Sequence, residues 1–87
     1  MVEIKILGSG CPNCKRLQQM ATRAAEHVRE EQDGFEFEIE KITDPGQFLE
    51  YGLLSTPGLV INEKLVSSGR IPSEEEIMPW LLDEMGA

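Results

Sequence analysis

The sequence predicts an α/β fold in which a mixed four-stranded sheet is flanked by three helices, in the order β-α-β-α-β-β-α. Residues 2–7 and 35–41 alternate apolar and polar side chains as strands do, and residues 12–31 between them repeat apolar side chains at helical spacing. After residue 58, two short apolar runs flank a two-residue turn, as in a β-hairpin. Because a long helix joins the first two strands, we expect them to lie parallel, with the hairpin as an antiparallel edge.

Length and composition indicate a small globular protein. The chain has 87 residues, 40% of them hydrophobic and 28% charged, so we expect residues 1–87 to form one domain. A net charge of −8 argues against nucleic acid as a partner, because phosphates require a basic surface. No apolar run could cross a bilayer, and the first residues lack the basic start and apolar core of a secretory signal. We therefore expect a cytoplasmic protein that does not bind membranes.

The first half of the chain predicts a strand, a long helix and a second strand. Gly8-Ser9-Gly10 ends the first strand, and the helix begins at Pro12, where a proline gives up no helical hydrogen bond. The apolar face of this helix comprises Leu17, Met20, Ala21, Ala24 and Val28. Asp33-Gly34 then makes a turn, and the second strand follows at about residues 35–41.

The second half predicts a short helix, a hairpin and a last helix. Asp44 caps the short helix, Pro45 takes its first position and Gln47 completes a capping box, and the helix ends near Gly52. The hairpin turns at Asn62-Glu63.

The last helix opens with a second capping box, formed by Ser73 and Glu76, and runs through Trp80 to Glu84. Pro79 lies inside this pattern, so we expect a kink or a late start there.

The two cysteines of the chain lie two residues apart, in the stretch GSGCPNC at the junction of the first strand and the first helix. We expect Cys11 at the helix N-cap and Cys14 one turn into the helix. Free N–H groups and the positive end of the helix dipole would then favour the Cys11 thiolate, which is the nucleophilic form of a thiol. Lys15 and Arg16 add positive charge nearby. Gly8 and Gly10 would allow a tight turn and leave room for the backbone of a partner.

This placement predicts different roles for the two sulfurs. Cys11 at the exposed tip would attack a substrate disulfide and form a mixed disulfide. Cys14, which we expect to point back toward the protein, would then attack the Cys11 sulfur and release the reduced substrate. The product would be an intramolecular Cys11–Cys14 disulfide.

A Cys-x-x-Cys pair also occurs in metal sites. A structural zinc site usually needs four ligands, and this chain offers two cysteines and one histidine. We expect that histidine, His27, to be a surface residue of the first helix. A carrier that binds copper(I) through Cys11 and Cys14 remains an alternative, although copper carriers of the ferredoxin-like fold end on a strand rather than a helix. A redox-inactive adaptor is a third possibility.

Two motifs together give a resemblance to the thioredoxin-like superfamily: Cys11-Pro12-Asn13-Cys14 after the first strand, and Thr56-Pro57 before the third. The sequence is most similar to the small, glutaredoxin-sized redox-active disulfide proteins of archaea and bacteria, over nearly the whole chain. The resemblance implies a thioredoxin-like fold and a cis peptide bond before Pro57. It also implies that the backbone of Thr56 contacts the substrate chain. Gly10, Pro12 and Asn13 would border the same substrate.

Departures from the superfamily pattern point to the substrate. Gly10 stands before the first cysteine, where thioredoxins carry tryptophan. Pro12, the first residue between the two cysteines, is more similar to the glutaredoxin pattern. The run Glu74-Glu75-Glu76 would repel the carboxylates of glutathione. We therefore expect protein disulfides as substrates and a thioredoxin-reductase-like flavoprotein or another dithiol as electron donor. We expect a monomer with no cofactor besides the cysteine pair. The first strand has no obvious buried acid to take the Cys14 proton.

Overall fold

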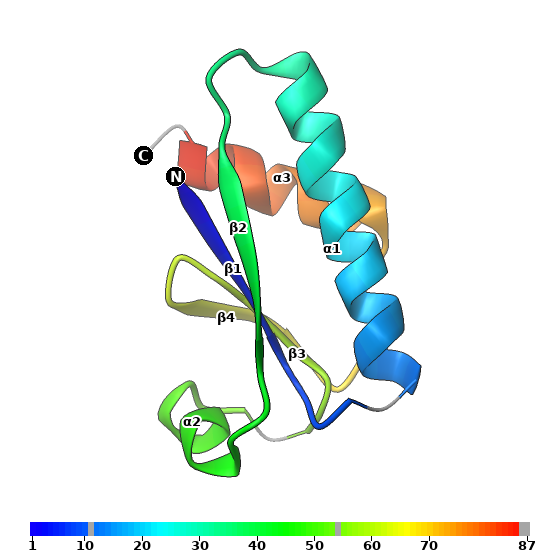
Figure 1. Cartoon of the computed structure of the whole chain (residues 1–87), viewed down its shortest axis with the longest axis vertical. Helices are drawn as coiled ribbons and strands as arrows, with labels where there is room; N and C mark the ends of the chain where they lie inside the picture. Colours follow the sequence, from blue (N-terminus) through cyan, green and yellow to red (C-terminus); the bar gives the residue numbers. More distant parts are fainter. Residues whose placement is uncertain (11, 54, 86–87) are drawn as a thin grey trace.

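The computed structural model describes residues 1–10, 12–53 and 55–85 (Figure 1). The element order is the predicted one, β-α-β-α-β-β-α. The elements are β1 (Val2–Leu7), α1 (Pro12–Glu31), β2 (Phe37–Ile42), α2 (Pro45–Glu50), β3 (Gly58–Ile61), β4 (Lys64–Ser68) and α3 (Glu74–Met85). In the described part of the chain, no helix is long and apolar enough to cross a membrane.

The sheet has the strand order β2-β1-β3-β4. β1 pairs with β2 in parallel and with β3 antiparallel, and β3 pairs antiparallel with β4 across the hairpin. This confirms the expected mixed four-stranded α/β sheet. The crossover helix α1 carries the chain back along the sheet from the end of β1 to the start of β2 (Figure 1).

The strand alternation separates two cores on the two faces of the sheet. Ile4 and Ile6 of β1 belong to the larger core, which also contains Leu17 of α1 and Ile77 of α3. Leu7 of β1 points the other way, into a smaller core that lies beside α2. The other buried members of that smaller core are Ile42, Leu53 and Val60. One face is therefore covered by two helices and the other by one short helix.

Figure 1 shows that several segments lie together at one end of the sheet. The last residues of β1, the first turn of α1 and the short helix α2 all lie toward the bottom of the view. The loop before β3 reaches the same end, because Gly58 pairs with Leu7, the last residue of β1.

The second strand begins at Phe37, two residues later than the predicted start at residue 35. The N–H of Val2, the first residue of β1, donates to the Glu36 carbonyl at 2.9 Å. Pairing with β1 therefore begins at Glu36, and Phe35 has no partner on that strand. Phe35 instead precedes the strand and is buried in the larger core. At the other end, the Gly8 N–H donates to the Ile42 carbonyl at 3.0 Å, which extends pairing beyond the predicted end.

Helix α2 begins as the sequence predicts. The Asp44 side chain accepts a hydrogen bond from the Gly46 N–H at 2.9 Å, with Pro45 in the first turn. The helix ends at Glu50, followed by the cap residue Tyr51 and by Gly52, whose φ of 78° favours glycine.

Helix α3 begins at Glu74, so a late start at Pro79 is wrong. The Ser73 Oγ accepts a hydrogen bond from the Glu76 N–H at 3.2 Å. This cap sets the start of α3 ahead of Pro79 in the sequence, and the helix continues through Pro79, which is exposed.

Candidate active site

Cys14 is the third residue of α1 and is only 6% exposed. Its sulfur packs against the backbone of Gly8, where a Cβ atom would overlap the Cys14 Sγ. Sequence reasoning assigned Gly8 to the turn that ends the first strand. The structure gives it a second role, because only a residue without a side chain leaves space for this sulfur. The expectation that Cys14 points toward the protein agrees with its burial.

Cys14 is disulfide-bonded, and no free cysteine occurs in the part of the chain that the structure describes. Cys11, the other cysteine of the sequence, lies outside the described residues. The N-cap position, exposure and nucleophilic role of Cys11 therefore stay predictions.

A small cavity of about 40 Å³ lies beside Cys14. It is lined by Ile6, Gly8, Gly10, Cys14, Lys15, Lys41 and Thr43. Lys41 was not anticipated from the sequence. Its position follows from the sheet register, in which Lys41 pairs with Ile6 on the face covered by α1. Among the described residues lining the cavity, the charged side chains are both cations, Lys15 and Lys41.

The loop before β3 presents the second motif. The Thr56–Pro57 peptide bond is cis, Pro57 is buried and Thr56 is exposed. The Pro57 carbonyl accepts a hydrogen bond from the Gly69 N–H at 2.9 Å, which ties this loop to the end of β4. The register of Gly58 with Leu7 brings the loop to the end of β1, next to Gly8 and hence to Cys14.

The remaining predicted site residues lie at the start of α1. Gly10, Pro12 and Asn13 are all exposed. Gly10 has a φ of 87°, a left-handed conformation that favours glycine, as the predicted tight turn requires.

An apolar groove of about 270 Å³ adjoins Thr56. It runs along α2 and is lined by Pro45, Phe48, Leu49, Leu53, Ser55 and Thr56. Leu49 is 77% exposed, which is unusual for a large aliphatic side chain. Sequence reasoning missed this groove, because Leu49 falls within an ordinary helical pattern.

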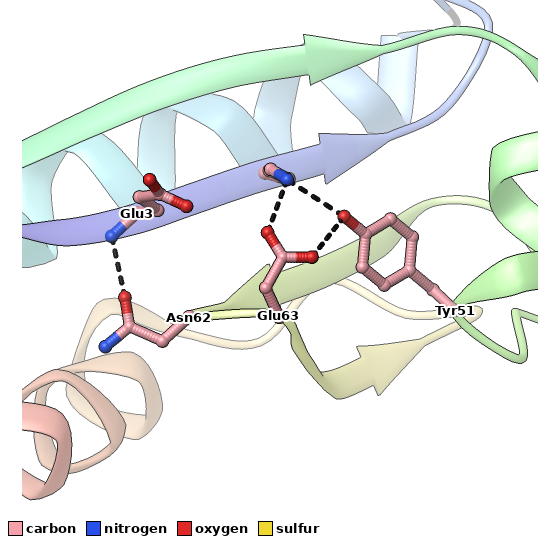
Figure 2. Close-up of polar contacts among 5 residues, drawn as sticks. Glu3, Tyr51, Asn62 and Glu63 are labelled. Carbon is pink, nitrogen blue, oxygen red and sulfur yellow. Dashed lines mark hydrogen bonds and ion pairs between the residues drawn. The ribbon is translucent and has the colours of Figure 1, made fainter.

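A polar network fixes the end of α2 to the sheet (Figure 2). The Tyr51 hydroxyl donates to the Glu63 carboxylate at 2.7 Å, and the Lys5 ammonium donates to both groups, at 2.9 Å and 2.6 Å. The hydrogen bond to Glu63, followed by that to Tyr51, raises the pKa of Lys5. The hydrogen bond from Lys5 likewise lowers the pKa of Glu63. The network joins β1, α2 and the hairpin turn, and so positions the chain that leads to Thr56.

The hairpin turn itself is held by side chains. Asn62 and Glu63 have φ values of 48° and 68°, as a two-residue turn of this kind requires. The Asn62 Oδ1 accepts a hydrogen bond from the Glu3 N–H at 2.9 Å, as Figure 2 shows. Asn62 also donates to Glu84 of α3 at 3.3 Å.

His27 is exposed on α1, as expected, and its Nδ1 lies 2.7 Å from the Glu74 carboxylate at the start of α3. The hydrogen bond to Glu74 raises the pKa of His27. Over the described residues, no group of three histidine, cysteine or acidic side chains could hold a metal ion.

Comparison with known proteins identifies the family. A family model described as a thioredoxin domain matches residues 2–82. The thioredoxin of Methanothermobacter thermautotrophicus is 40% identical over 77 residues, which are 88% of this chain and 94% of that protein. The thioredoxin of Methanocaldococcus jannaschii is 38% identical over 77 residues, covering 88% of this chain and 83% of that protein.

Solved structures share the fold at low sequence identity. Chloroplastic thioredoxin z superimposes with a TM-score of 0.69 and 18% identity, over 100% of this chain and 80% of that one. The first two thioredoxin domains of Eps1p from Saccharomyces cerevisiae give a TM-score of 0.61 and 15% identity, over 95% of this chain and 34% of that one. The fold is thioredoxin-like, and the chain belongs to the thioredoxin family of thiol–disulfide oxidoreductases.

Proposed function

We propose that this protein reduces protein disulfides through its two cysteines, with Cys11 as the attacking group and Cys14 as the resolving group. The burial of Cys14 in the first turn of α1 carries the proposal. A cysteine residue that is only 6% exposed is poorly accessible to a large substrate, whereas its sulfur can react with a neighbour in its own chain.

The chemistry balances in two steps. The Cys11 thiolate attacks one sulfur of the substrate disulfide; a mixed disulfide forms, and the other substrate sulfur leaves as a thiolate that takes a proton from water. The Cys14 thiol loses its proton to water, and its thiolate attacks the Cys11 sulfur. The Cys11–Cys14 bond forms, the bond to the substrate breaks, and the second substrate thiolate is released. Two electrons have then passed from the protein to the substrate.

The exposed residues around the cysteines would bind the substrate chain. We assign the backbone contact to Thr56, beside Pro57, and the border of the binding surface to Gly10, Pro12 and Asn13. The exposure of Thr56 beside a buried Pro57 supports this assignment.

We further propose that the reduced form is regenerated by a thioredoxin-reductase-like flavoprotein or another dithiol donor, and that the cysteine pair needs no further cofactor. The protein would act in the cytoplasm as a monomer, with residues 1–87 as one thioredoxin-like domain. Neither nucleic acid nor a membrane is among the proposed partners.

Two experiments test the proposal. In a titration with dithiothreitol redox buffers, read by thiol trapping and mass, we expect one reversible two-electron step between about −200 and −300 mV. Failure to form a reversible disulfide would refute the redox function and direct attention to copper(I) binding.

The second experiment assigns the roles of the sulfurs. With insulin as a disulfide substrate, the Cys14→Ser variant should accumulate a mixed disulfide on a non-reducing gel, because the resolving thiol is missing. The Cys11→Ser variant should accumulate none. The reverse pattern would exchange the roles of Cys11 and Cys14, and the variant that lacks both cysteines controls for non-covalent capture.

A further inference from the structure

We propose that this protein selects polypeptide substrates with acidic side chains next to the disulfide, and that Lys15 and Lys41 bind those side chains. The inference rests on the proposed function and narrows its substrate to one class of protein disulfide. It starts from the charges around the cavity beside Cys14, which Lys15 lines from α1 and Lys41 lines from β2.

The charge beside Cys14 is opposite to the charge of the chain as a whole. Acidic residues outnumber basic residues by 16 to 8. Among the described residues that line the cavity, however, the charged side chains are Lys15 and Lys41. The apolar groove along α2 is lined by no charged side chain of the described residues. A substrate chain that lies on these two surfaces would therefore meet cations and no acid.

The acidic neighbours of Lys41 in the sequence are directed elsewhere. Glu40 pairs with Lys5 and points to the opposite face of the sheet, because side chains alternate along a strand. The Asp44 side chain accepts a hydrogen bond from the Gly46 N–H at 2.9 Å and is thereby held at the start of α2. The cavity side of β2 therefore presents the lysine without an acid next to it on its own strand.

Both lysines are available to a partner. Lys15 and Lys41 are exposed, and neither forms an ion pair with a residue that the structure describes. Lys64, by comparison, lies 3.0 Å from the Glu84 carboxylate. Because an ammonium group has three donors, a substrate carboxylate can bind to either free lysine without displacing an acid of the protein.

The net charge of −8 does not cancel this attraction at short range. At physiological ionic strength the Debye length is about 8 Å, so distant acidic residues are largely screened, whereas contacts within a few ångströms persist. An exposed ion pair typically strengthens binding by a factor of about 1.4 to 5. Two such pairs predict a preference of about threefold to tenfold for an acidic substrate over a neutral one of the same shape.

The extent of the surface favours a polypeptide over a small anion. Thr43 lines the cavity and Pro45 lines the groove, so the two surfaces adjoin along the chain. The groove, of about 270 Å³, offers space for an apolar side chain of the same substrate segment. A small anionic disulfide such as glutathione disulfide would use the lysines and leave the groove empty.

Two disulfide peptides test the preference. Each contains one intramolecular disulfide, and they differ only in the residues that flank the cysteines, which are glutamate in one peptide and glutamine in the other. The reduced protein is mixed with each peptide, quenched with acid and analysed by mass, which gives the rate constant for its oxidation. Rates of reduction of the same peptides by dithiothreitol correct for their intrinsic reactivity. After this correction, the glutamate peptide should react about threefold to tenfold faster.

Charge reversal identifies the residues responsible. The ratio of the two rates cancels any effect of a variant on the protein's own sulfurs, because both peptides meet the same cysteines. In the double variant Lys15→Gln with Lys41→Gln, the ratio should fall to about one. In Lys15→Glu with Lys41→Glu it should invert, and a third peptide with flanking lysines should react fastest. Arg23→Glu is the matched control and should keep the preference, since Arg23 is an exposed cation of α1 that lies beside Glu26 and does not line the cavity.

The outcomes separate this inference from the proposed function. Equal rates for the glutamate and glutamine peptides would overturn the inference and leave disulfide exchange intact, as would an unchanged preference in both double variants. Oxidation of the reduced protein by glutathione disulfide as fast as by the glutamate peptide would overturn the assignment to a polypeptide. If none of the peptides oxidised the reduced protein, the proposed function would fail as well.

Discussion

Replacement of Gly8 by alanine tests the contact that holds the Cys14 sulfur. The added methyl group would overlap the Cys14 Sγ and lie 3.2 Å from the Cys14 Cβ. Neither the backbone at Gly8 nor helix α1 can shift easily to relieve this overlap. The Gly8 N–H is bound to the Ile42 carbonyl at 3.0 Å, and α1 is anchored by the fully buried Leu17. Overpacking of this kind typically costs about 1–3 kcal/mol, so we expect the free energy of unfolding to fall by about that amount.

Urea denaturation of the reduced protein, followed by circular dichroism, measures this change as a lower midpoint at constant slope. The reduced form is the appropriate reference because a disulfide would itself alter the unfolded state. Gly46→Ala is the matched control. Its Cβ would lie 3.4 Å from the Asp44 Oδ1, an ordinary contact, and alanine favours a helix more than glycine does.

The variant should also slow the proposed resolving step, because the methyl group displaces the Cys14 sulfur. With Ellman's reagent, Cys11 would release a first coloured thiolate and Cys14, by attack on the mixed disulfide, a second, so the rate of the second release measures this step. A Gly8→Ala protein that matches the unsubstituted chain in both stability and second-release rate would refute the packing argument. A protein that loses stability but resolves normally would show that α1 moves as a unit and keeps the two sulfurs in register.

Two further predictions concern polar contacts away from the cysteines. Tyr51→Phe removes the hydroxyl that joins Lys5 and Glu63, so the melting temperature should fall by a few degrees. Because the chain that leads to Thr56 is then less well positioned, the KM for a protein disulfide should rise more than kcat changes, and an unchanged KM would contradict this. The contact with Glu74 raises the folded pKa of His27 above its ordinary value of 6.5. The stabilisation is therefore fully present below the ordinary pKa and is lost as pH rises through the raised value. The urea midpoint of His27→Ala should fall below that of the unsubstituted protein near pH 5.5 and match it near pH 9, whereas an equal deficit at both pH values would show that the contact does not depend on the histidine charge.

The sequence predicted those parts of the fold whose signals are local. Gly8-Ser9-Gly10 and Pro12 set the end of β1 and the start of α1 at the observed residues. The start of β2 was misplaced, because it depends on which residue faces Val2 across the sheet. The start of α3 after Ser73 was predicted from the capping box, and of the two alternatives offered at Pro79, a kink or a late start, the late start is wrong.

The candidate site divides in the same way. The burial of Cys14 followed from helical spacing, and the cis bond before Pro57 followed from the family resemblance. Lys41 and Tyr51 could not be assigned, because strand register and a network of three distant segments place them. In a sheet, such long-range pairings are the information that periodicity alone does not contain.

The unequal cover of the two sheet faces has a consequence for local unfolding. Helix α2 has no buried residue of its own, and it lies beside the smaller core, which is separate from the core under α1 and α3. Detachment of α2 would break the Tyr51 network but would expose no buried residue of the helix, so its amides should exchange with solvent through openings that leave the rest of the sheet folded. The groove next to Thr56 lies on this same segment. The surface proposed to bind the substrate would thus adapt its shape without disturbing the helix that carries Cys14.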